Sequence, residues 1–200
     1  MQVQVKKSFY QSFGGINFMD ADINAIGFSG IVAENIGSRS ILAEYSYADL
    51  LKQILYSKTI GGDVLDDINT LKEKLQDHPQ LKISSPDTIE YAFQELRKPS
   101  KTILTKTGKE HLVNEHKGFN QLSIKLCKKA GLLNSTKAHT MDYDGHIIEN
   151  TKTDNAFTYK KSEGYYPVIC SINKLPIYLQ NFKWQHPGKL WSANYHCCCI

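Results

Sequence analysis

The spacing of apolar residues changes once along this 200-residue chain, and that change constrains the fold more than any other feature. Up to Asn134, large apolar residues recur every three or four positions, which is the spacing of one helix face. After Ser135 they alternate with polar residues, which is typical of strands. A chain that is first helical and then forms an antiparallel meander is expected to be an α+β protein.

Helices are expected in the first two thirds of the chain. Leu50, Leu51, Ile54 and Leu55 form one apolar stripe. A Ser-Pro pair at Ser85 offers a cap followed by proline in the first turn, which favours a helix start. The expected helices cover residues 47–56, 64–75, 86–96 and 119–132. Residues 97–109 are rich in lysine and poor in large apolar side chains, and we expect them to form an exposed basic connection.

Three antiparallel strands are expected after the helices. The alternating segments cover residues 139–144, 165–172 and 175–179. Asn173 and Lys174 lie between the last two segments and predict a tight turn. Pro176 places the third strand at a sheet edge or close to its own start.

The overall charge is mildly basic. The chain has a net charge of +4 and a pI of about 8.7, which fits a polyanionic partner but is also common in proteins of other classes. No stretch reaches the ~20 apolar residues of a membrane helix, and the first residues lack the apolar core of a signal peptide. We therefore expect a cytoplasmic protein with no membrane partner.

Asp142 and Asp144 are the strongest candidates for chemistry. Residues at i and i+2 of a strand project from the same face, so these two carboxylates are expected to lie side by side. Carboxylate oxygens suit Mg²⁺ or Mn²⁺, and such ions assist phosphoryl transfer. The alternative is a polar strand edge that faces solvent, since this triplet is common.

Two groups of lysines are candidates for DNA binding. Lys125, Lys128 and Lys129 lie on the expected helix over residues 119–132, where they also fit the solvated face of an amphipathic helix. Lys152, Lys160 and Lys161 alternate with Phe157 and Tyr159, and such a mixture can hold phosphates and stack on bases. The alternative for this second group is a β-connection whose aromatic rings pack on the core.

Several short stretches, taken in order, resemble a known family. The stretches are GGDVLDDIN at 61–69, SPDT at 85–88, MDYD at 141–144, TYK at 158–160 and GYYP at 164–167. Together they resemble the group 1 DDE transposases of bacterial insertion sequences, over residues 8–181.

The resemblance implies a division of the chain and a role for Asp144. A helical DNA-binding region would cover residues 1–134, and the first strands of a ribonuclease-H-like catalytic domain would cover 135–181. Asp144 best matches the first catalytic carboxylate, with Asp142 as the alternative; relatives often carry Ser-Thr after this Asp, whereas this chain has Gly145. The implied activity is cutting and joining of insertion-sequence ends with two divalent metal ions (Mg²⁺ or Mn²⁺), and the implied partners are transposon-end DNA and a possible second copy of the chain in a homodimer.

The second Asp and the Glu of that family lie further downstream, and residues 182–200 no longer resemble it. We therefore expect a truncated chain that is inactive alone, with a tail read in a shifted frame. Two other functions stay open. One is a non-catalytic DNA-binding module that competes for transposon ends, and the other is a small metal-dependent nuclease that uses Asp142 and Asp144.

The frame shift makes a direct prediction about the gene. Translation of the other reading frame just beyond the codon for Asn181 is expected to give a phrase such as Asn-Gly-Asn-Thr-Pro and then a long open frame. Nucleotide sequencing checks this, and an early stop codon with no downstream Asp or Glu would rule it out.

Overall fold

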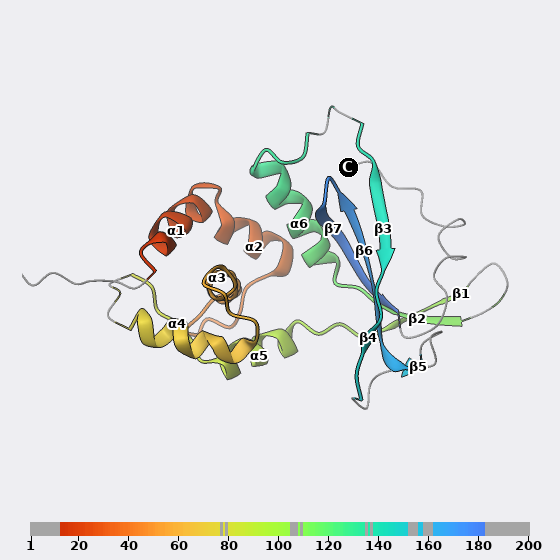
Figure 1. Ribbon diagram of the computed structural model, residues 1–200, viewed down its shortest axis with the longest axis horizontal. Helices are drawn as coiled ribbons and strands as arrows, with labels where there is room; N and C mark the ends of the chain where they lie inside the picture. The colour runs from red at the N-terminus through yellow and green to blue at the C-terminus, as the bar shows by residue number, and fades with distance from the viewer. Residues whose placement is uncertain are drawn as a thin grey trace, which may run out of the picture. The chain divides into compact units, whose positions relative to one another are not determined.

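The computed structural model describes most of the chain and divides it into two compact units, Met1–Leu96 and Arg97–Ile200 (Figure 1). The described residues are 13–76, 78, 80–104, 108, 110–134, 136, 138–151, 156–157 and 162–182. Of the expected tail at 182–200, residues 183–200 lie outside them, and Phe182 is the last residue of a strand. Each unit is described by itself below.

The first unit is helical. Its central helix is α3, around which the other helices lie (Figure 1). The elements are α1 Gly15–Ala25, α2 Phe28–Ile36, α3 Tyr47–Thr59, a 3₁₀ turn η1 Leu65–Asp67, α4 Ile68–Lys74 and α5 Pro86–Glu95. The helices expected over residues 47–56, 64–75 and 86–96 are thereby confirmed.

Side-chain caps fix the starts of α3 and α5. The Ser46 hydroxyl accepts a hydrogen bond from the Asp49 backbone N–H at 3.2 Å, and the Asp49 carboxylate accepts one from the Ser46 N–H at 2.9 Å. This reciprocal capping box satisfies two N–H groups that a helix start otherwise leaves without partners. At α5, the Ser85 hydroxyl accepts from the Thr88 N–H, and Pro86 occupies the first turn.

A buried amide joins α3 to the segment before α5. Gln53 is 2 % exposed, and its Oε1 accepts hydrogen bonds from the Ser84 N–H at 2.9 Å and from the Ser84 hydroxyl at 2.7 Å. Its Nε2 donates to the Lys82 carbonyl at 3.2 Å. Because the buried amide is bonded on both sides, it costs little to bury and fixes where α5 begins.

The second unit is an antiparallel sheet with one long helix. Its elements are β1 Lys101–Leu104, β2 Glu110–Asn114, α6 Lys117–Lys129, β3 Met141–Gly145, β4 Ile148–Glu149, β5 Ala156–Phe157, β6 Glu163–Ile172 and β7 Leu175–Phe182. Within the described residues the strand order is β1-β2-β7-β6-β3, and β4 and β5 also pair with β6. The expected α+β class is confirmed.

The hairpin β6–β7 is the longest strand pairing of the sheet. Asn173 and Lys174 connect the two strands with φ angles of 52° and 67°. Two successive left-handed residues form the type of turn that matches the twist of antiparallel strands, and asparagine tolerates this conformation well. The tight turn predicted at these residues is therefore confirmed, and β7 extends beyond the expected end at residue 179.

Helix α6 packs against β7 through side-chain hydrogen bonds (Figure 1). The Asn120 amide accepts from the Leu179 N–H at 2.9 Å and donates to the Leu179 carbonyl at 3.2 Å. The same helix contributes Ile124 and Cys127 to a cluster with the buried Cys170 and Ile172. The helix thus covers one face of the sheet. It also hydrogen-bonds the β7 backbone at Leu179, which does not pair with β2.

The structure corrects the expectation for residues 97–109. Residues 101–104 are not part of an irregular connection but form β1, paired with β2 from Lys101–Val113 to Leu104–Glu110. Strand β2 in turn pairs with β7 at Val113 and Asn114. These backbone hydrogen bonds tie residues 97–134 to the sheet, and the chain divides after Leu96 rather than after Asn134.

The cap of α6 makes stability depend on pH. The His116 ring Nδ1 accepts a hydrogen bond from the Phe119 N–H at 3.2 Å, which requires an unprotonated nitrogen. Burial, reinforced by the positive charge of Lys98, lowers the pKa of His116. A lowered folded-state pKa means that the unfolded chain binds more protons, so stability is complete above the unfolded value of about 6.5 and declines as pH falls below it.

We expect the urea unfolding midpoint of the second unit to be lower at pH 5.5 than at pH 7.5. The variant His116→Asn keeps a capping side chain without a titrating group, so its midpoint should change less over this range. Unfolding curves of both proteins at the two pH values test this. An equal pH dependence in the variant would show that His116 is not responsible.

Candidate functional site

The two candidate carboxylates lie on the open face of the sheet. Asp142 and Asp144 are both exposed, whereas Tyr143 between them is half-buried and packs on the core face. In the register of β3 with β6, Asp142 is opposite Ser171 and Asp144 is opposite Ile169. The side chains therefore project from one face, opposite the face that α6 covers.

Packing against the neighbouring strand explains why a glycine follows Asp144. A Cβ at position 145 would overlap the ring and hydroxyl of Tyr166 on the neighbouring strand. Because Gly145 has no side chain, the Tyr166 ring can lie against the β3 backbone directly after Asp144. The departure from the Ser-Thr of the transposases thus has a packing reason in this chain.

The carboxylate pair does not form a closed metal centre with other described residues. Among the described residues, no three His, Cys, Asp or Glu side chains gather into a metal-binding group. Mg²⁺ commonly binds through one or two carboxylates while it keeps water and takes phosphate oxygens as further ligands. Two adjacent carboxylates on an exposed strand are therefore compatible with Mg²⁺ or Mn²⁺, and other ligands would have to complete the site.

Strand β3 lies at one end of the sheet. In the part of the chain that the structure describes, it pairs with β6 on one side only. An edge strand presents backbone N–H and C=O groups to which a further strand can pair. A further strand paired with the free edge of β3 would therefore place additional side chains next to Asp142 and Asp144.

The structure does not bring the candidate lysines to the carboxylates. Lys128 and Lys129 are exposed in the last turn of α6, and Lys125 is partly buried on the same helix. This helix covers the opposite face of the sheet from Asp144. Lys152, Lys160 and Lys161 lie outside the described residues.

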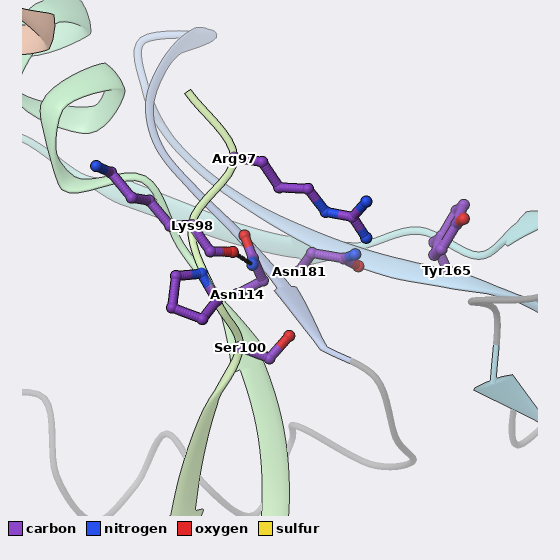
Figure 2. A pocket seen from close by; sticks show the side chains of 7 residues that line it. Arg97, Lys98, Ser100, Asn114, Tyr165 and Asn181 are labelled. Carbon is purple, nitrogen blue, oxygen red and sulfur yellow. Dashed lines mark hydrogen bonds between the residues drawn. The ribbon is translucent and has the colours of Figure 1, made fainter. Parts of the chain in front are cut away.

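A basic pocket in the second unit was missed by the sequence reasoning. It has a volume of about 360 Å³ and is formed where the chain enters β1, next to β2, β7 and β6 (Figure 2). Its lining residues are Arg97, Lys98, Pro99, Ser100, Asn114, Tyr165 and Asn181. The signal in the sequence was the Arg97-Lys98-Pro99 stretch, which we assigned to a connection because the pairing of β1 was not recognised.

Formal charge is divided unequally between the two units. Residues 1–96 contain 8 Lys and Arg against 13 Asp and Glu, a net charge of −5. Residues 97–200 contain 16 Lys and Arg against 7 Asp and Glu, a net charge of +9. A polyanion is therefore attracted to the second unit rather than to the helical first unit.

Comparison of the chain with protein-family models, curated proteins and solved structures found no match. The resemblance to transposases therefore stays a prediction. No helix within the described ranges is long and apolar enough to cross a membrane.

The exposure of the carboxylates predicts that they are dispensable for folding. The double variant Asp142→Asn/Asp144→Asn should leave the urea unfolding midpoint unchanged, because both side chains lie in solvent on the open face. Ile172→Ala, on the same sheet but 1 % exposed, should cost about 2–5 kcal/mol. A large loss of stability in the double variant would instead give the carboxylates a structural role.

Proposed function

We propose that the chain derives from a DDE transposase and acts on DNA, with Asp144 as the first catalytic carboxylate of a ribonuclease-H-like sheet and Asp142 as the alternative. One observation carries the proposal. The strands β3, β6 and β7 form an antiparallel meander, and the acidic pair stands on the open face of its first strand, at the end of the sheet. The resemblance implies that the first catalytic Asp lies on the first strand of the catalytic domain over residues 135–181, and β3 is the first described strand of that range.

The chemistry follows from the ligands that are present. A divalent ion held there would supply Lewis-acid stabilisation of charge on a phosphodiester. Asp144 and Asp142 would hold the ion from one side, and their exposure leaves the other side open to a phosphate oxygen. The described residues supply no further carboxylate next to them. We therefore propose that this chain binds metal and DNA but does not join strands by itself.

The alternative, a non-catalytic DNA-binding module, is favoured by the charge of the second unit. The resemblance implies DNA binding in the helical region 1–134. Within that region the net positive charge belongs to residues 97–134, with 9 Lys and Arg against 2 Asp and Glu. We therefore propose the sheet unit, including α6, as the main DNA-binding surface.

Metal binding is tested with Mn²⁺, whose paramagnetism broadens nearby NMR signals. Titration of the full chain should broaden the backbone amides of residues 142–145 and 169–171 first, because these positions flank the carboxylates. The variant Asp142→Asn/Asp144→Asn should abolish this broadening. Selective broadening elsewhere, or none at millimolar Mn²⁺, would contradict the metal site.

Incubation of the full chain and its Asp variants with end-sequence DNA and Mg²⁺ distinguishes the possible activities. We expect no strand transfer from the chain alone. Robust strand transfer would show a complete catalytic site, and metal-dependent cutting lost in Asp144→Asn would favour the nuclease.

DNA binding is tested with two matched pairs of lysines. Lys128 and Lys129 are exposed in the last turn of α6, and Lys72 and Lys74 are exposed in the last turn of α4. Replacing Lys128 and Lys129 by Gln should weaken binding to a DNA duplex and reduce its dependence on salt, since fewer counterions are released. The Lys72→Gln/Lys74→Gln control removes the same charge from the acidic unit and should change little.

Gel-shift titrations between about 50 and 200 mM salt measure the DNA affinity of both double variants. Equal weakening by the two pairs would contradict placement of the DNA on the second unit. Binding that is insensitive to salt would contradict an electrostatic DNA interface altogether.

A further inference from the structure

The basic pocket combines three different groups that can recognise a ligand. Figure 2 shows the Arg97 side chain extending over Asn181 toward Tyr165, while the Lys98 ammonium points away. The Asn114 amide donates a hydrogen bond to the Lys98 carbonyl at 2.6 Å, which anchors the backbone next to Arg97. Arg97 adjoins this anchored backbone, and its planar guanidinium carries a fork of donors whose geometry matches a phosphate group.

Asn181 adds an acceptor that the described residues leave unused. Its Oδ1 is buried and has no hydrogen-bond partner within the described residues. Burial of an unsatisfied carbonyl oxygen is costly, and such an atom in a pocket is a natural acceptor for a ligand N–H or O–H. A fully ionised phosphate ester has no such donor to offer, so the pocket contains more than an anion site.

Tyr165 supplies an aromatic surface at the far wall of the pocket (Figure 2). It lies on β6, and its partly buried ring faces the same cavity as Arg97. Aromatic side chains stack on nucleobases irrespective of base identity. A volume of about 360 Å³ falls at the lower end of the range for small-molecule sites. Among the described lining residues there is no carboxylate to repel a phosphate.

We propose that this pocket binds one nucleotide unit. Arg97 contacts the phosphate, the base stacks on Tyr165, and a base N–H donates to Asn181 Oδ1. The nucleotide is either free or part of a single-stranded DNA. This subsite uses none of the carboxylates of the proposed metal site, so each can fail without the other.

The register of the sheet places the pocket on the same face as the acidic pair. Tyr165 and Ile169 are four residues apart on β6 with no bulge between them, so they share a face. Asp144 is opposite Ile169, and Asn181 is opposite both Pro167 and Asn114. Four strand residues span roughly 13 Å, so a nucleic-acid strand held at Arg97 can run over the open face toward Asp144.

The experiment is a calorimetric titration of the full chain with deoxyadenosine monophosphate, inorganic phosphate and a single-stranded hexamer of deoxyadenosine. Arg97→Gln should weaken binding of the mononucleotide at least about tenfold. Tyr165→Leu should weaken it roughly 5- to 100-fold, whereas Tyr165→Phe should retain it, because only the ring is needed. Asn181→Leu should also weaken it, and Lys72→Gln on α4 serves as a cation control outside the pocket.

Comparison of the three ligands shows whether the pocket binds a free nucleotide or a nucleotide within a DNA strand. Tighter binding of the hexamer than of the mononucleotide identifies a DNA strand, and equal binding identifies a free nucleotide. Phosphate binding as tight as mononucleotide binding would overturn the proposal. Folded Arg97→Gln and Tyr165→Leu variants that bind the mononucleotide as tightly as the wild-type chain would also overturn it.

A readout on the wild-type chain keeps the test independent of variant folding. NMR contacts between the adenine protons and the Tyr165 ring should be present, and their absence at saturation would also overturn the proposal. Mononucleotide binding should be unchanged in Asp142→Asn/Asp144→Asn, which separates this subsite from the metal site.

Discussion

Pairing along β6 determines where the acidic pair and Asn181 lie. Strands β3, β4, β5 and β7 all hydrogen-bond to this strand, and Val168, Cys170 and Ile172 turn their side chains into the core. The alternate residues of β6 then face outward. The acidic pair is placed by the β3 register and Asn181 by the β7 register, so both ends of the open face depend on one strand. A shift of one residue would send these groups into the core.

Local patterns made much of the fold predictable. Ser85 and Pro86 mark the start of α5 through a cap and a fixed φ angle, and Asn173-Lys174 marks a hairpin because few residue pairs accept two left-handed conformations. Alternation also predicted that Asp142 and Asp144 would share a strand face. In each case the determining interaction lies within a few residues of the signal.

The features that were missed depend on distant partners. Strand β1 has only four residues, and its stability comes from pairing with β2, so its lysine-rich composition predicted a connection instead. The pocket joins Arg97 to Tyr165 and Asn181, which are distant in sequence and meet only through the order of the strands. The division of the chain after Leu96 likewise follows from β2 reaching β7. No local spacing contains this information.

The position of Asp142 and Asp144 on an edge strand has a consequence apart from catalysis. A second copy that added its own β3 to this edge would bring like charges next to one another, which destabilises the pairing. Negative charge on a terminal strand is one of the means by which sheets avoid unwanted growth. The acidic pair therefore opposes pairing of this edge with another strand, so selection against aggregation alone can retain these residues.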